Sequence, residues 1–208
     1  EMCIRDRSCP AILQTWFPGQ EFGNALAAIL FGKESPSGKL PTTYPKKLSD
    51  TPAYSSYPGK NLQMDYKEKL LVGYKWYDKK KIEPLFPFGH GLSYSKFKLK
   101  KVSVTKKKHE IKIKVKLKNI GDISTFETVQ CYLERKAVKA ETPKKKLVDF
   151  KKLKVAENKS KKLTLKVSKR DLSEWDVKKS KWEIAKGDFI IHVGTSVKDI
   201  SITEEIKI

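Results

Sequence analysis

The sequence predicts a mainly β protein in which a C-terminal antiparallel β-sandwich follows an irregular connector and a truncated α/β unit. Three observations predict this arrangement. Residues 98–208 contain short runs in which apolar and polar side chains alternate, and residues 51–97 are rich in proline, glycine and aromatic residues. Residues 11–50 contain one strand, turn and helix pattern.

The β-sandwich is predicted by a period of two in the second half of the chain. Residues 111–118 alternate isoleucine, valine or leucine with lysine, which places one face in a core and the other in water. A turn at residues 119–122 follows, and further apolar positions recur at strand spacing. Short strands separated by turn residues are typical of an antiparallel sandwich. The predicted core positions are Ile111, Ile113, Val115, Leu117, Val129, Cys131, Leu133, Leu163, Leu165, Val167, Phe189, Ile191, Val193, Ile200 and Ile202.

The connector is predicted over residues 51–97. Prolines and glycines recur between residues 34 and 94, and aromatic residues are interleaved with them. A disordered linker is poor in aromatic residues, so this composition indicates an ordered, irregular segment that wraps over other surfaces. The segment contains too few periodic residues to form a domain of its own.

The α/β unit is predicted over residues 11–50. Residues 11–16 are expected to be the end of a strand, and residues 17–20 a turn. A short helix follows, with Gly32 at its C-terminal cap. One such unit cannot bury both faces of a sheet, so we expect it to be unstable without neighbours. The residues on the apolar face of the helix are Phe22, Ala25, Leu26, Ile29 and Leu30.

Residues 1–10 are expected to be a leader unrelated to the rest, because residues 1–8 (EMCIRDRS) show no periodicity; they could be an artefact of sequence assembly. They contain no apolar stretch typical of a secretory signal. Cys3, Cys9 and Cys131 form neither a paired framework nor metal-ligand spacing, so no metal site and no cofactor are predicted. Cys131 is expected to be a small core residue.

The net charge of +21 requires an explanation, because strongly basic domains often bind nucleic acid. Residues 1–97 carry +5, and residues 98–208 carry +16. Almost all of the basic residues are lysine, whereas phosphate and base recognition favours arginine. We therefore expect a solvated lysine surface that also protects edge strands, and no nucleic-acid partner. No apolar run approaches the length of a membrane span, so no membrane partner is expected either.

Several motifs in order resemble the C-terminal region of glycoside hydrolase family 3, the β-glucosidase-like enzymes. The resemblance covers residues 11–208, with tyrosine often present in the family at the position of His90. Taken together and in this order the motifs are highly specific. They are WFPGQEFGNALA at 16–27, LFG at 30–32, SPSGKLP at 35–41, YKEKLLVGYKWYD at 66–78, PLFPFGHGLSY at 84–94, KNIGD at 118–122, VQCYL at 129–133 and VGTS at 193–196.

The resemblance implies a division into the end of an α/β sandwich domain (11–50), a connector (51–97) and a fibronectin type III-like domain (98–208). It implies a retaining glycosidase that removes terminal β-D-glucosyl or related residues from β-linked oligosaccharides. In the family the nucleophile lies in an N-terminal barrel and the acid/base in the α/β domain, both upstream of this chain. We therefore assign no catalytic residue and expect this piece alone to be inactive, with the barrel and the α/β domain as its intramolecular partners. Polysaccharide-degrading relatives are commonly secreted, but the sequence leaves localisation open.

Trp16 and Glu21 are the candidate substrate-binding residues, in the intact enzyme only. Trp16 could be a sugar-stacking wall or a core residue, and Glu21 beside Asn24 at a helix N-terminus favours local hydrogen bonding. Residues 74–77 are expected to pack between domains, and His90 to be structural. Glu174, Trp175 and Asp176 could form a carbohydrate platform, but a turn with an acidic side chain bonded to the backbone is the simpler interpretation.

An alternative function class remains open. The chain could be a stand-alone basic module that binds acidic polymers or nucleic acid through the lysine runs 106–108 and 144–146. These runs are expected to lie between strands, where solvated charge is usual. The enzyme hypothesis instead predicts bare aromatic surface between residues 16 and 94, because the partner domains would cover it.

Overall fold

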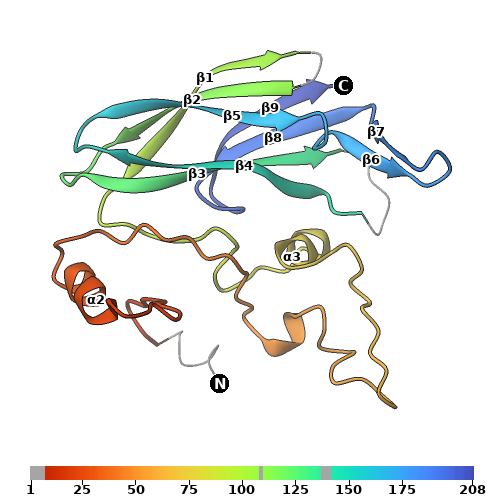
Figure 1. Cartoon of the computed structure of the whole chain (residues 1–208), viewed down its shortest axis with the longest axis horizontal. Helices are drawn as coiled ribbons and strands as arrows, with labels where there is room; N and C mark the ends of the chain where they lie inside the picture. The colour runs from red at the N-terminus through yellow and green to blue at the C-terminus, as the bar shows by residue number, and fades with distance from the viewer. Residues whose placement is uncertain (1–7, 108–109, 137–141) are drawn as a thin grey trace.

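A computed structural model describes residues 8–107, 110–136 and 142–208. The predicted leader falls mostly on residues 1–7, outside the described residues, and so does Lys108 of the first lysine run. In Figure 1 the strands form a layered body, and the chain before β1 runs along one side of it. No helix in the described ranges is long and apolar enough to cross a membrane.

Two antiparallel sheets form the predicted sandwich. The three-stranded sheet has the order β1 (Phe97–Lys106), β2 (Glu110–Asn119), β5 (Ser160–Ser168). The four-stranded sheet has the order β4 (Lys145–Val155), β3 (Thr125–Arg135), β8 (Asp188–Gly194), β9 (Ile200–Lys207). A hairpin of β6 (Ser173–Asp176) and β7 (Lys181–Ile184) extends from one end (Figure 1).

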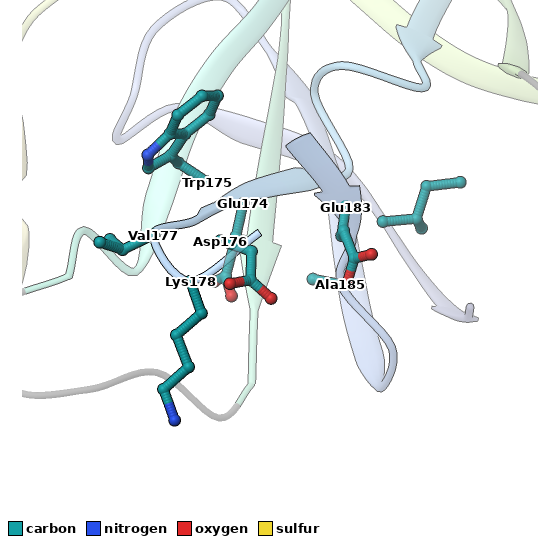
Figure 2. Close-up of a pocket in the computed structure, with 8 residues that line it drawn as sticks. Glu174, Trp175, Asp176, Val177, Lys178, Glu183 and Ala185 are labelled. Atoms are coloured by element: carbon teal, nitrogen blue, oxygen red, sulfur yellow. The ribbon is translucent and has the colours of Figure 1, made fainter. Parts of the chain in front are cut away.

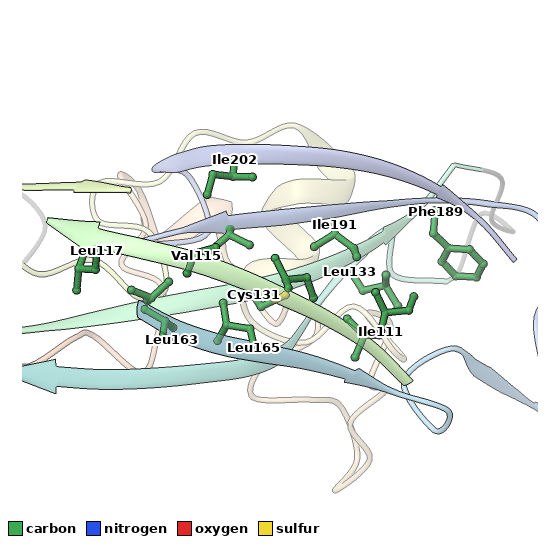
Figure 3. Close-up of a cluster of buried hydrophobic side chains, with 14 of the residues drawn as sticks. Ile111, Val115, Leu117, Cys131, Leu133, Leu163, Leu165, Phe189, Ile191 and Ile202 are labelled. Carbon is green, nitrogen blue, oxygen red and sulfur yellow. The ribbon is translucent and has the colours of Figure 1, made fainter. Parts of the chain in front are cut away.

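The core lies between the two sheets, where the predicted alternation is confirmed (Figure 3). Each inward position of β2 is at most 1% exposed, and β3, β5 and β8 contribute their predicted apolar residues. Ile202 of β9 is buried, while Ile200 is only partly so. The Cys131 thiol lies in this core, and burial raises its pKa to about 12, as expected for an inert thiol.

Two strands that the alternation did not reveal are β1 and β4. The β1–β2 pairing shifts register between Lys101 and Ser103, and the β3–β4 pairing shifts between Cys131 and Tyr132. A bulge adds one residue and so reverses which positions face inward. The period of two is therefore interrupted in both strands, and neither was predicted.

The expected strand at residues 11–16 is wrong, because these residues are irregular and Trp16 has φ 55°. That conformation is rare for a bulky residue and ends any extended run. The helix was predicted correctly as α2 (Phe22–Leu30), followed by Gly32 at φ 73°. None of its residues is fully buried, and Phe22 and Leu30 of its apolar face are exposed, so this face is only partly covered in the described part of the chain.

The irregular segment is longer than the predicted connector: it takes in all of residues 11–96, which we call the connector from here on. It contains a 3-10 turn η1 (Leu48–Asp50) and an unpredicted helix α3 (Tyr74–Lys80). Seven residues are too few to show helical periodicity in sequence. The connector crosses the outer face of the four-stranded sheet and leaves the three-stranded sheet uncovered on the far side (Figure 1). One side of the connector therefore faces the four-stranded sheet and the other faces away from it. The residues considered next lie along the connector.

Candidate functional site

A buried ion pair joins the connector to the sandwich. The Lys39 ammonium lies 2.9 Å from the Glu127 carboxylate of β3, and the two side chains are 13% and 8% exposed. Lys39 also donates to the Gly91 carbonyl at 2.6 Å. An unpaired buried charge is costly. Here each charge has an opposite partner, and the Gly91 carbonyl accepts a further hydrogen bond from the ammonium. The SPSGKLP segment is thus fixed to both the sandwich and the segment before β1.

The α3 helix makes a second connection, to β4. Tyr74 accepts a hydrogen bond from the Leu147 amide at 2.8 Å and stacks on Phe88 at 4.8 Å between ring centroids. Asp78 pairs with Lys145 at 3.3 Å. Tyr77 is also 5% exposed, and Trp76 donates to the Asp50 carbonyl at 3.0 Å, so these aromatic residues pack within the described part of the chain. Their expected packing between domains stays a prediction.

Gln130 of β3 lies buried at the contact between the connector and the sandwich, which we call the junction. Its amide donates to the carbonyls of Gly89, at 3.1 Å, and Thr195, at 2.5 Å. The Tyr132 hydroxyl donates to the Gln130 oxygen at 2.5 Å. One side chain therefore links the connector, β3 and the loop after β8, and burial raises the pKa of Tyr132. Gly89 leaves the space that Gln130 occupies, since a Cβ there would overlap the amide.

His90 packs within this region. Its ring stacks on Phe86 at 5.5 Å between ring centroids, and its carbonyl accepts a hydrogen bond from the Leu40 amide at 2.8 Å. Burial, and then the nearby Lys39 charge, lower the pKa of His90. No cluster of metal ligands occurs in the part of the chain that the structure describes.

Many apolar side chains of the connector are exposed. Phe17 is fully exposed, Phe31 is 83% exposed and Tyr57 is 73% exposed. Exposed apolar side chains so concentrated mark an interaction surface. The aromatic surface that the enzyme hypothesis predicted between residues 16 and 94 is therefore present. We call it the bare face; its residues are Trp16, Phe17, Phe22, Leu30, Phe31, Leu48, Tyr54, Tyr57, Leu62, Tyr66, Leu70, Val72, Leu92 and Tyr94.

Trp16 and Glu21 both lie at this surface. Trp16 is 50% exposed. Glu21 precedes α2 and accepts a hydrogen bond from Asn24 at 2.7 Å, which is the local bonding expected for it.

A hollow of about 440 Å³ lies at the β6–β7 hairpin (Figure 2). Residues 174–176 lie in β6, and turns flank this strand on both sides, so the expected turn is displaced. The expected bond from an acidic side chain to backbone is present: Asp176 accepts from the Lys179 amide at 3.1 Å, and Asp171 accepts from the Ser168 amide at 2.8 Å. Trp175 pairs across the hairpin with Trp182, and Arg170 lies 3.3 Å over the latter ring. These contacts explain the tryptophans by hairpin packing.

The described residues of the two lysine runs lie only partly between strands. Lys107 and Lys144 do, as expected, whereas Lys106 ends β1 and Lys145 and Lys146 begin β4. Lys145 is occupied by Asp78 and the Val197 carbonyl, and burial lowers the pKa of Lys146. The second run therefore serves the junction with α3 and is not a free basic loop.

The fold and the junction together define a fibronectin type III-like sandwich to which an extended connector is fixed. Family models agree: residues 1–94 match the glycosyl hydrolase family 3 C-terminal domain, and residues 127–197 match the fibronectin type III-like domain. The chain belongs to glycoside hydrolase family 3, as the C-terminal part of its architecture.

Relatives agree over almost the whole chain. It is 40% identical, over 95% of its length, to thermostable beta-glucosidase B of Acetivibrio thermocellus. It is 35% identical, over 95%, to an exo-alpha-(1->6)-L-arabinopyranosidase of Bifidobacterium breve. The crystal structure of a Bifidobacterium adolescentis GH3 beta-glucosidase superposes with a TM-score of 0.89 at 34% identity, over 94% of this chain and 29% of that one. The chain spans 27% and 26% of the two curated relatives.

Proposed function

We propose that this chain is the bracing C-terminal part of a retaining, β-glucosidase-like glycoside hydrolase. The observation that carries the proposal is the two-sided connector. One side is fixed to the sandwich by buried ion pairs, and the other presents the bare face. A connector fixed in this way can hold the catalytic domains in a constant position relative to the sandwich, with the bare face as the surface that they contact.

The upstream barrel and α/β domain are the proposed occupants of the bare face. The partly exposed apolar side of α2 supports this assignment, because a helix buries its apolar face against a neighbouring layer in a complete domain. The catalytic carboxylates are assigned to those domains. The substrate is a β-linked oligosaccharide with a terminal glucosyl or related residue. Relatives that are named for glucosides and for arabinopyranosides share this segment, so the sugar is selected elsewhere.

The test is to extend the coding sequence upstream from the source and to assay the whole product on p-nitrophenyl β-glucoside, beside this chain alone. Turnover by the whole product and none by the chain is the expected result. Turnover by the purified chain, or an inert whole product, would overturn the proposal.

We also propose that Trp16 and Glu21 border the substrate cleft of the intact enzyme. The support is an exposed ring and an exposed carboxylate at the edge of the bare face. In the whole product, Trp16→Ala is expected to raise KM about tenfold through lost stacking on the sugar. Phe150→Ala, an exposed aromatic of β4, is the control. An unchanged KM in Trp16→Ala would assign that residue to packing alone.

A further inference from the structure

The uncovered face of the three-stranded sheet carries an ordered array of lysines. On β2 the inward positions are apolar and every second residue from 112 to 118 is lysine. The strand register continues the array onto both neighbours. We call this surface the lysine face; its residues are Lys98, Lys100, Lys112, Lys114, Lys116, Lys118, Lys162 and Lys166.

The register places like charges directly opposite each other. Lys116 pairs with Lys100 on β1 and with Lys162 on β5, so three lysines form one row across the sheet. Lys118 likewise pairs with Lys98. Like charges in opposed positions destabilise a sheet, so this arrangement costs folding free energy. One ion pair reduces the repulsion at the start of β2, where the Glu110 carboxylate lies 2.9 Å from the Lys112 ammonium.

Edge protection does not account for the array. We expected outward lysines to prevent edge strands from pairing with other chains. However, β2 is the central strand of its sheet and is paired on both sides. Solubility needs charge but not rows of one sign, and mixed charges would supply it without repulsion. The array therefore has a use outside the fold.

The geometry suits an extended polyanion. Charges repeat about every 6.6–6.8 Å along β2 and about every 4.7–4.9 Å across the strands. The other positions opposite these lysines are hydroxyl residues, including Ser103, Thr105 and Thr164, which can donate to oxygen. The outward residues of these three strands include neither arginine nor an aromatic ring, the side chains that stack on bases. A polysaccharide that bears acidic groups fits better than nucleic acid.

We propose that the lysine face binds an acidic polysaccharide, one that carries carboxylate or sulfate groups along its length. The face lies on the opposite side of the sandwich from the connector, so it stays open when the bare face is covered (Figure 1). Binding here requires no catalysis and is independent of the proposed glycosidase activity. Its effect would be to hold the protein on an anionic glycan matrix.

The experiment measures binding of the full 208-residue chain to polygalacturonate, heparin and double-stranded DNA at 50 and 150 mM salt. The test variant is Lys116→Glu/Lys118→Glu, which reverses two central charges. Its matched control is Lys178→Glu/Lys186→Glu, which makes the same change in net charge at exposed lysines of the hairpin region. Circular dichroism establishes that both variants are folded.

The proposal predicts glycan binding that persists at 150 mM salt. The test variant should bind about tenfold more weakly with a shallower salt dependence, and the control within about twofold of the original. If polygalacturonate binds more tightly than heparin, the preferred ligand is a polymer that carries carboxylates. If heparin binds more tightly, the preferred ligand is a sulfated polymer. Equal weakening by both variants, no binding at 150 mM salt, or stronger binding to DNA than to either glycan would overturn the proposal.

Discussion

At the scale of single residues, the junction requires a glycine beside Gln130, because a larger residue would occupy the space of the Gln130 amide. Gly89 has φ 79°, and a Cβ there would overlap the Gln130 amide. Asn119 shows the complementary case: it is fully buried, donates to the Ile123 and Val155 carbonyls, and accepts from Ser95. The FGHG and KNIGD motifs are therefore explained by packing rather than by catalysis.

Gly89→Ala is expected to lower the free energy of unfolding by about 2 kcal/mol or more, through the left-handed backbone and displacement of Gln130. Urea denaturation followed by fluorescence measures it. Gly38→Ala is the control, because a Cβ there would meet no atom within 4 Å. Equal stability of the two variants would contradict the role given to Gln130.

His90→Tyr tests the pH dependence of stability. Because burial lowers the pKa of His90, the unfolded chain binds a proton below about pH 6.5 that the folded chain does not. The contribution of neutral, buried His90 to the free energy of unfolding is therefore fully present above pH 6.5 and is lost progressively as the pH falls below that value. The variant should lose less stability than the original between pH 7.5 and 5.5, measured by thermal melts. His192, whose pKa is also lowered by burial, should preserve part of the effect.

At the scale of elements, the Lys39–Glu127 pair carries the contact between connector and β3. Lys39→Met leaves the Glu127 carboxylate buried without its partner, and we expect a cost of about 3–5 kcal/mol. Adding Glu127→Leu should restore part of it. Lys198→Met, which breaks the exposed pair with Glu83, should cost under about 1 kcal/mol in the same urea titration. Similar costs for the buried and the exposed pair would contradict this account.

The lysine row makes an unusual prediction for β2. Lys116→Glu replaces two repulsive cross-strand contacts by two attractive ones, and should stabilise the fold by about 0.2–1 kcal/mol for each pair. The gain should shrink in high salt, since the charges are exposed. Destabilisation in this variant, measured by denaturation at low and high salt, would show that the row is not strained.

The sequence predicted the sandwich well because β2, β5 and β8 bury alternate residues without interruption. It missed β1 and β4, where bulges break the period, and α3, which is too short to show one. The junction was out of reach for another reason. Lys39 and Glu127 are 88 positions apart, and no local pattern marks two such residues as partners. Only the motif order, through the family resemblance, pointed to this region.

At the scale of the whole molecule, the bare face should govern behaviour in solution. The chain produced alone is expected to bind a hydrophobic dye and to self-associate at micromolar concentration. Phe17→Ser/Phe31→Ser should reduce both effects, as measured by dye fluorescence and light scattering. Phe126→Ser/Phe150→Ser, at exposed aromatics of β3 and β4, should leave them unchanged; an equal reduction there would argue against a localised surface.

The central claim is that this chain braces catalytic domains, and reconstitution tests it most directly. The upstream part of the whole product and this 208-residue chain are made separately, and p-nitrophenyl β-glucoside turnover is measured for each and for the mixture. The account predicts turnover that appears or rises at least about tenfold on mixing and is lost with Phe17→Ser/Phe31→Ser. Full turnover by the upstream part alone, unchanged by this chain, would contradict it.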